Sequence, residues 1–163
     1  MILIVTGFTL YYFISARKSS PQELFTENFN PYQDIISIKG SQEIIDDKRK
    51  LLLVGIYFYN SMKYDSSSVV FEYLNKETPS NDTIAFYLAN SLLATGKNPK
   101  KVIKLLTTLS KNENIFTQHS KWYLALAYLQ NNNPGSAKSC LLDIVDKSTI
   151  YKEKAQTILN ELQ

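Results

Sequence analysis

Residues 51–58 read Leu-Leu-Leu-Val-Gly-Ile-Tyr-Phe, and two later stretches repeat their pattern: residues 86–92 (Phe-Tyr-Leu-Ala-Asn-Ser-Leu) and residues 122–128 (Trp-Tyr-Leu-Ala-Leu-Ala-Tyr). Each stretch holds a small residue with a large apolar residue three positions later, about one helical turn further on. Helices approach each other closely where side chains are small, so this recurring alternation predicts helices packed in pairs. The small residues recur at intervals of 34 and 36 residues (Gly55, Ala89, Ala125), and the large residues are Phe58, Leu92 and Tyr128.

A second helical pattern follows each of these stretches. The first helix is expected from Ser41 to about Ser61, with a turn at residues 63–65 (Lys-Tyr-Asp). Gly96 is expected to end the helix of the second stretch. The partner helix then begins at residues 98–99 (Asn-Pro), one residue later than the repeat pattern predicts. The small and inner apolar positions of the partner helices are Ser67, Phe71 and Leu74, then Val102, and finally Ala137, Leu141 and Ile144.

These intervals resemble the tetratricopeptide repeat (TPR) family over residues 48–146, because one such repeat is 34 residues long. The resemblance implies an all-α fold, a right-handed superhelix of about three TPR helix hairpins at residues 48–147. A C-terminal capping helix is expected at residues 148–163, since one of its faces is apolar and the other polar. The apolar positions are Tyr151, Ala155, Ile158 and Leu162, and the polar ones Lys152, Lys154, Gln156 and Glu161.

The composition fits one folded domain with a short appendage. The chain has 163 residues, of which 44% are hydrophobic and 20% charged, whereas only five are Gly and five are Pro. So few turn-forming residues favour helices with short loops over a turn-dense β-sandwich. The net charge of +3 comes mostly from lysines, with Arg17 and Arg49 as the arginines, and nucleic acid is not expected as a partner.

Residues 1–14 carry no charge, and Arg17 and Lys18 follow closely. As a helix these residues would span about 21 Å, which is less than the hydrocarbon core of a bilayer at about 30 Å. A cleaved signal peptide, a buried core helix and a short uncleaved anchor are alternatives. We favour a transmembrane segment at residues 1–16, the second half of a span that begins upstream. The two basic residues argue for a cytoplasmic domain after it.

A short helix is predicted after the apolar stretch. Ser20 suits the N-cap, Pro21 the first helical position, and Glu23 can complete a capping box. The helix is expected to stop at residues 30–31 (Asn-Pro), and residues 17–47 as a whole form a juxtamembrane helix and connector. Its apolar side chains are expected to dock against the first repeat and shield the exposed end of that repeat: Leu24, Phe25 and Phe29.

The order of anchor, short helix and repeats, with residues 23–25 (Glu-Leu-Phe), Phe29 and residues 31–32 (Pro-Tyr), is similar to membrane-anchored TPR proteins of Bacteroidota-type bacteria. In that family a cytoplasmic segment resembling an anti-sigma factor often precedes a single span, and the repeats lie in the periplasm. The resemblance implies a bacterial inner-membrane protein with a periplasmic TPR domain. It opposes the orientation that the two basic residues indicate, so the cytoplasmic side stays open.

We expect no catalysis, cofactor or metal site. His119 is the only histidine and Cys140 the only cysteine, too few for a zinc site of the common Cys/His types. Cys140 lies on an apolar helix face, which favours burial over a reactive thiol. His119 is expected on the first turn of its helix, partly solvated. Asp46 and Asp47 are adjacent on a predicted helix and do not converge on one substrate.

Four lysines form the densest basic cluster of the sequence. Their spacing places them along one side of a helix, where a solvated outer face is expected. The alternative is contact with anionic lipid headgroups or with an acidic partner. The cluster consists of Lys97, Lys100, Lys101 and Lys104.

Surface recognition is the role that remains. The resemblance implies that the first helix of each pair lines a concave face that binds a peptide or another protein. Asn90 is the leading residue for hydrogen bonds to a peptide backbone, whereas Trp122 also fits packing in the core. The residues expected to bind the partner on the concave face are Leu52, Ile56, Tyr59, Asn60, Phe86, Asn90, Leu93, Trp122, Leu126, Leu129 and Gln130.

The predicted function is a membrane-tethered protein–protein interaction scaffold. The alternative is the output or regulatory half of a transmembrane signalling protein of the anti-sigma type, which a cytoplasmic helical module upstream of Met1 would favour. A hydrolytic enzyme would require a polar pocket around His119 with converging acids.

Overall fold

The computed structural model describes residues 19–33, 47–147 and 150–162, and these residues form eight α-helices and no strand. The predicted all-α class is therefore confirmed for this part of the chain. The helices are α2 (Pro21–Asn28), α3 (Asp47–Asn60), α4 (Tyr64–Glu77), α5 (Asp82–Thr95), α6 (Pro99–Lys111), α7 (Thr117–Gln130), α8 (Pro134–Lys147) and α9 (Lys152–Glu161).

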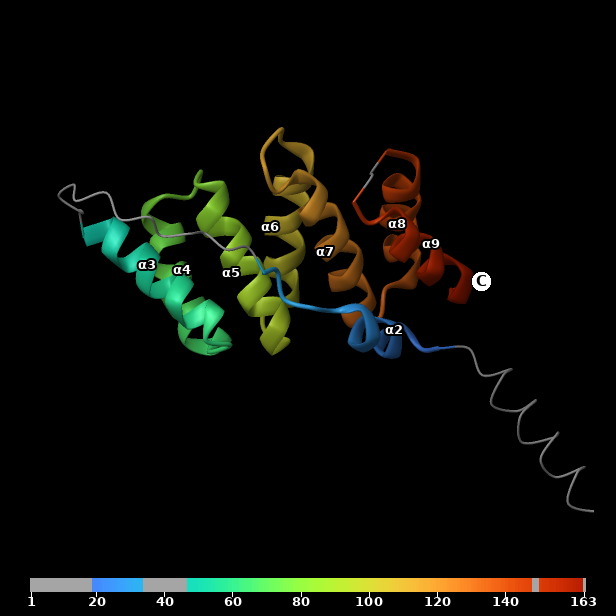
Figure 1. Ribbon diagram of the computed structural model, residues 1–163, viewed down its shortest axis with the longest axis horizontal. Coiled ribbons are helices and arrows are strands. Elements are labelled where there is room, and N and C mark those ends of the chain that lie inside the picture. Colours follow the sequence, from blue (N-terminus) through green and yellow to red (C-terminus); the bar gives the residue numbers. More distant parts are fainter. Residues whose placement is uncertain (1–18, 34–46, 148–149, 163) are drawn as a thin grey trace, which may run out of the picture.

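From α3 to α9, each helix packs against the next helix in the chain, and the helices stand in sequence order along the long axis (Figure 1). In addition, α3 touches α5, and α5 touches α7. Because each helix buries its apolar face mainly against its sequence neighbours, most of the core is built from local contacts. The alternate helices α3, α5 and α7 are thereby brought to one side of the array.

The packing of the first helix pair centres on Gly55 and Phe71. A Cβ atom on Gly55 would lie 3.0 Å from the Phe71 ring, so any larger residue here would require the ring to move by a few tenths of an ångström. Ser67 of α4 donates a hydrogen bond to the backbone carbonyl of Gly55 (3.1 Å), and its hydroxyl lies 3.0 Å from that of Ser91 on α5. These contacts confirm that Gly55 and Ser67 are the small residues at the helix crossing.

Helix ends follow the predicted signals closely, with one difference. Gly96 adopts a left-handed conformation (φ 67°) after α5, and its amide donates to the last carbonyls of that helix. The turn predicted at residues 63–65 is wrong, because α4 already begins at Tyr64. The turn is completed earlier, where Met62 takes a positive φ of 57° and its amide donates to the Tyr59 carbonyl (2.9 Å).

The partner helices and the last helix bury the side chains that the pattern predicted. On the predicted inner face of the last helix, Ala155 and Ile158 are buried, and the other two residues are half-buried. On its predicted outer face, three residues are exposed and Glu161 is half-buried. The fully buried positions include Phe71 and Leu74 on α4, Val102 on α6, Ala137, Leu141 and Ile144 on α8, and Ala155 and Ile158 on α9.

The first described helix, α2, docks on α7 and not on the first repeat as predicted. Its capping box is complete, since Glu23 accepts from the Ser20 amide (2.7 Å) and Ser20 accepts from the Glu23 amide (3.2 Å). Leu24 is fully buried, and Ser19 donates to Glu161 of α9 (2.9 Å). The apolar side chains of α2 do find a helix surface, but it belongs to the third predicted repeat.

The predicted transmembrane segment at residues 1–16 lies outside the described residues, as do residues 41–46 at the expected start of the first long helix. No helix of the described ranges is long and apolar enough to cross a bilayer.

Candidate partner-binding face

The side of the array formed by α3, α5 and α7 carries a stretch of the chain's own N-terminal region. Residues 29–33, which we call the internal segment, leave α2 without helical structure and run from α7 towards α5 (Figure 1). Phe29 itself has extended backbone angles. We call the surface beneath the segment the A face, and it consists of Tyr59 on α3, Phe86 and Tyr87 on α5, Phe116 before α7, and His119 and Tyr123 on α7.

Tyr32 inserts its ring into an aromatic cluster on the A face. Its centroid lies 5.0 Å from that of Phe86 and 4.7 Å from that of His119, both with edge-to-face geometry. Phe116 stacks on Phe86 at 4.3 Å and forms the floor of the cluster. Edge-to-face aromatic pairs add attraction beyond simple burial of area, so these ring contacts help to hold Tyr32 in the cluster.

The main chain of the internal segment is also held. Tyr123 donates a hydrogen bond from its hydroxyl to the carbonyl of Asn30 (2.8 Å), across 93 positions of sequence. Burial raises the pKa of the Tyr123 hydroxyl above its ordinary value, so the proton that it donates is retained. Burial likewise raises the pKa of Tyr59. The backbone of Tyr32 lies near the Tyr59 hydroxyl and opposes part of this rise, although the distance and angle between them do not make a regular hydrogen bond. The A face therefore contacts both the backbone and the side chains of the segment.

A cavity of about 280 Å³ lies beside the internal segment, towards the C-terminal end of the array. His119 and Tyr151 meet there, with 2.7 Å between the imidazole Nδ1 and the phenol oxygen. Burial raises the pKa of Tyr151, so its hydroxyl stays protonated. Trp122 stacks on the Tyr151 ring at 4.9 Å, which places Trp122 in packing between α7 and the start of α9. The cavity is lined by Asn28, Asn30, Pro31, Tyr32, Gln33, His119, Trp122, Tyr123, Tyr151 and Lys154.

The residues predicted to bind a partner lie mostly inside the molecule. Leu52 and Gln130 are half-buried, and Asn60 is exposed at the end of α3. In this structure the chain itself covers the other side chains of the set, and partner binding by them stays a prediction. The buried members are Ile56, Tyr59, Phe86, Asn90, Leu93, Trp122, Leu126 and Leu129.

The two amides in the predicted set have different partners. Gln130 of α7 donates to the carbonyl of Leu93 near the end of α5 (3.1 Å), so it ties these two helices together. Asn90 is fully buried and donates to Phe86 of its own helix (3.1 Å), whereas its side-chain oxygen has no hydrogen-bond partner. Among the contacts that the structure describes, neither amide touches the internal segment.

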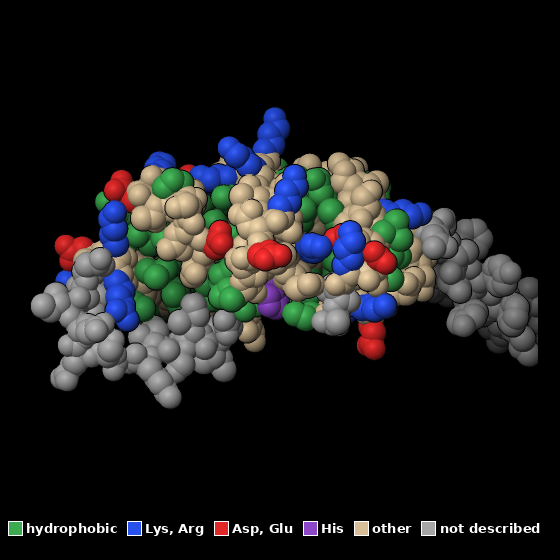
Figure 2. All heavy atoms as spheres, turned by 90° about the horizontal axis from the view of Figure 1, so that it is seen from above, with side chains coloured by type: hydrophobic (Ala, Val, Ile, Leu, Met, Phe, Trp, Pro, Cys, Tyr) green, Lys and Arg blue, Asp and Glu red, His purple; other side chains and the backbone are tan. Residues whose placement is uncertain are grey.

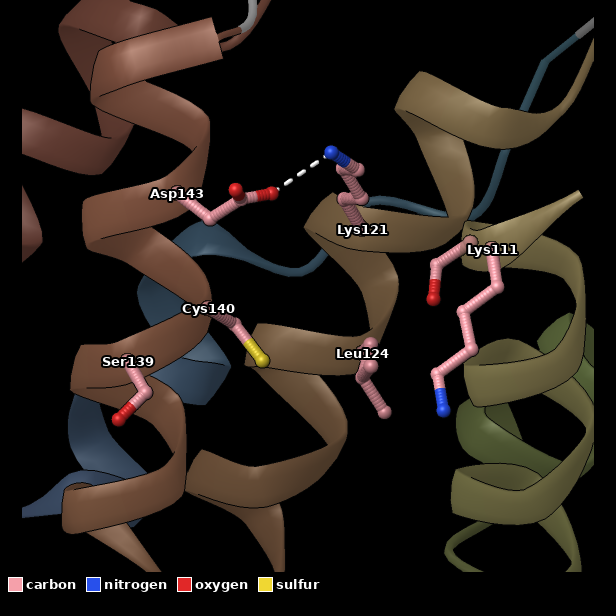
Figure 3. Close-up of a pocket in the computed structure, with 7 residues that line it drawn as sticks. Lys111, Lys121, Leu124, Ser139, Cys140 and Asp143 are labelled. Carbon is pink, nitrogen blue, oxygen red and sulfur yellow. Dashed lines mark hydrogen bonds and ion pairs between the residues drawn. The ribbon is translucent and has the colours of Figure 1, made fainter. Parts of the chain in front are cut away.

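A second cavity, of about 350 Å³, opens between α6, α7 and α8 (Figure 3). Lys121 reaches across it to the carboxylate of Asp143 (2.6 Å). Burial, with a smaller contribution from Asp143, raises the pKa of the nearby Cys140 thiol to about 11, so at neutral pH this thiol is protonated and a poor nucleophile. The lining is Ser110, Lys111, Lys121, Leu124, Ser139, Cys140 and Asp143.

Two members of the lysine cluster form ion pairs, whereas the other two form none with a described residue. Lys97 forms an ion pair with Asp65 of α4 (2.8 Å), and Lys101 forms one with Glu72 of the same helix. Lys100 and Lys104 line a cavity of about 710 Å³ between α6 and the end of α4. Figure 2 shows basic and acidic side chains interspersed over one side of the molecule, which differs from the continuous basic stripe of a nucleic-acid surface.

Comparison with known proteins yields no assignment: the chain matches no protein-family model, no curated protein and no solved structure. Within the described residues, no three His, Cys, Asp or Glu side chains lie close enough together to hold a metal ion. Function is therefore argued from the A face alone.

Sequence reasoning missed the residues that hold the internal segment. Tyr32 falls in the expected connector, and the sequence pattern indicates no role for Tyr123 beside Trp122. Phe29 was expected in a docking contact, but with the first repeat. The one available signal was the density of aromatic residues, with 11 Tyr and 8 Phe in the chain, and it does not say which rings meet.

Proposed function

We propose that this protein is a TPR-type scaffold, a right-handed superhelix of about three helix hairpins, that binds an extended segment of a partner protein on the A face. In this proposal residues 1–16 tether the chain to a bacterial inner membrane, with the helical domain on the periplasmic side. The role is recognition and not catalysis.

Two features support the TPR-type architecture. The small residues Gly55, Ala89 and Ala125, which follow one another at intervals of 34 and 36 residues, are all buried. Each of the three helices that carry them packs against the helix that follows it in the chain. Stacked helix pairs of this kind place the first helices of the pairs side by side, which creates one elongated surface for a ligand.

The observation that carries the proposal is that the A face holds a non-helical stretch of polypeptide. Tyr123 binds a main-chain carbonyl, and the Phe86–Phe116 stack receives a side chain. Scaffolds that recognise extended peptides use this combination, because main-chain hydrogen bonds supply affinity and side-chain pockets supply specificity. A surface that binds one such segment has the chemistry to bind another.

Site-specific photo-crosslinking in the native membrane tests the scaffold function. A benzophenone amino acid replaces Asn60, which is exposed at the end of α3, and in a matched control replaces Leu142, which is exposed on α8. We expect a discrete adduct with a partner protein from position 60 and none from position 142. Equal labelling at both positions, or no adduct at either, would contradict the proposal.

A further inference from the structure

We infer that the internal segment, residues 29–33, is a built-in ligand that occupies the partner's position on the A face. The inference rests on the proposed function and deepens it by naming the partner's chemistry. The partner is an extended peptide that presents an aromatic side chain, tyrosine in the internal copy, to the cluster around Phe86 and His119. It also offers a main-chain carbonyl to the hydroxyl of Tyr123.

The first argument is that the contacts recognise chemical groups that any peptide can supply. The Tyr123 hydroxyl binds a carbonyl oxygen, which every residue possesses. The Tyr32 ring enters edge-on between Phe86, Phe116 and His119, a geometry that depends on an aromatic ring and not on its connection to α2. Pro31 precedes this ring and restricts the backbone of Asn30 to extended conformations. An external segment with a Pro-aromatic step can therefore reproduce the contacts.

The second argument is that the internal segment can leave while α2 stays in place. The helix α2 is fixed on its own account by fully buried Leu24, by its capping box and by the bond from Ser19 to Glu161. In the segment itself, Asn30 and Gln33 are exposed, and Pro31 and Tyr32 are half-buried. The helices of the array pack on their sequence neighbours without using the segment. Its exchange breaks the ring contacts of Phe29 and Tyr32 with the A face and leaves the helix–helix contacts in place.

The third argument is that the internal segment fits the site incompletely. The cavity of about 280 Å³ is lined by the segment, by α7 and by residues at the start of α9, with Gln33 and Lys154 among its polar lining residues. A partner with a larger side chain before its proline can fill this space and gain contacts that the internal copy lacks. The partner can therefore exceed the internal segment in intrinsic affinity, as displacement requires.

Occupancy by a tethered ligand lowers the apparent affinity for a free one. A segment joined to its site competes at an effective concentration on the order of millimolar. The apparent affinity of an external peptide falls in proportion to the fraction of molecules whose site is open. Weakening the internal segment therefore strengthens binding of the external peptide, whereas weakening the face itself has the opposite effect.

The experiment measures binding of a fluorescein-labelled peptide with the sequence of residues 28–33 (Asn-Phe-Asn-Pro-Tyr-Gln) by fluorescence anisotropy. The protein is the full chain in mild detergent, which suits the apolar residues 1–14. We expect Tyr32→Ala to bind the peptide about tenfold or more tightly than the wild type. The matched control is Tyr73→Ala, because Tyr73 is an exposed tyrosine on α4, and it should bind as the wild type does.

Two further measurements test the assigned contacts. Phe29→Ala also weakens the internal segment and should raise the affinity for the peptide by a smaller factor. This variant replaces Tyr32→Ala as the test if Tyr32→Ala does not give a helical circular dichroism spectrum. In the Tyr32→Ala background, Tyr123→Phe should weaken peptide binding about three- to tenfold, the effect of one hydrogen bond. A peptide in which alanine replaces the tyrosine should not bind measurably.

Several outcomes would overturn the inference. They are equal affinity of the wild type and the folded variants, no binding to a folded variant at millimolar peptide, or equal binding of the alanine peptide. The two proposals fail separately. A crosslinked partner at position 60 without peptide binding would refute only the proposal of an internal ligand. Tight peptide binding without any crosslinked partner would refute the scaffold function and support the internal ligand.

Discussion

At the scale of single residues, Gly55 shows how one missing side chain decides the spacing of two helices. The ring of Phe71 fills the space next to its Cα, and Phe71 is held in turn by stacking on Tyr87, with 5.6 Å between ring centroids. The ring is fully buried and has little room to retreat. Glycine within a helix lowers stability by about 1 kcal/mol relative to alanine, and the close contact with the Phe71 ring opposes that preference at this position.

The substitution Gly55→Ala is expected to lower the free energy of unfolding by about 1–3 kcal/mol, because the added methyl group overpacks the Phe71 ring. Urea denaturation followed by circular dichroism measures the change. Gly135→Ala is the matched control, since a Cβ at Gly135 meets only a side-chain atom at 3.9 Å. The control should be neutral or slightly stabilising, and an equal response of the two variants would refute the packing role of Gly55.

Asn90 raises a different question at the same scale, because it is fully buried with an unsatisfied oxygen. Asn90→Leu removes that acceptor with the same number and branching of heavy side-chain atoms and should raise the free energy of unfolding by about 1 kcal/mol. Denaturant titration of both proteins measures the difference. A clear loss of stability would show that the oxygen has a compensating interaction. If Asn90 serves the partner, as the sequence predicted, the same variant should also reduce the crosslink from position 60.

At the scale of helix pairs, the ion pair between Lys121 and Asp143 links α7 to α8. The two side chains are 21% and 34% exposed, and Lys147 also reaches Asp143 (2.7 Å). The hydrogen bonds from Lys121 and from Lys147 lower the pKa of Asp143 below its ordinary value. A carboxylate of this kind stabilises the fold at pH values above its unfolded pKa, which is about 3.9, and loses that contribution as the pH falls through its lower folded pKa.

Asp143→Asn should therefore be less stable than the wild type at pH 6, by about 0.2–1 kcal/mol because the pair is partly solvated. The difference should shrink as the pH is lowered towards 3. Thermal unfolding across this pH range measures it, with Asp146→Asn as control, since Asp146 is exposed and forms no ion pair with a described residue. A difference that stays constant with pH would exclude the ion pair as its source.

At the scale of the whole molecule, α2 joins the beginning of the described chain to its end. Leu24 is fully buried, and α2 packs on α7 while Ser19 bonds to α9. Contacts between helices are otherwise made along the sequence order, so α2 supplies long-range closure in an array of local contacts. Such closure stabilises the C-terminal helices more than the distant α3–α4 pair.

Leu24→Ala should lower the free energy of unfolding by about 2–5 kcal/mol, the usual effect of a truncated core leucine. Hydrogen exchange should show lost amide protection in α7–α9 before any loss in α3–α4. Leu142→Ala, at a leucine that is 52% exposed, is the control and should change little. Uniform loss of protection along the whole array would contradict local transmission through α7.

The helices, their order and most of the core can be predicted from local sequence patterns alone. The small residue Gly55, the capping box at Ser20 and the stop at Gly96 are local signals, and the structure confirms what each of them predicts about its own neighbourhood. They succeed because a helix begins, ends and buries a face according to residues within a few turns of each other. The binding of an external partner stays a prediction.

Only the tertiary structure decided where the N-terminal region goes. Nothing in the spacing of Phe29 and Tyr32 says that they meet Tyr123 and Phe86, since partners 54 to 94 positions apart share no periodicity. The prediction of partner-binding residues does not include this internal contact for the same reason. The repeat pattern places side chains on a helix face, but it cannot show that the chain's own segment already covers that face. Long-range aromatic contacts and one hydrogen bond from Tyr123 made that choice.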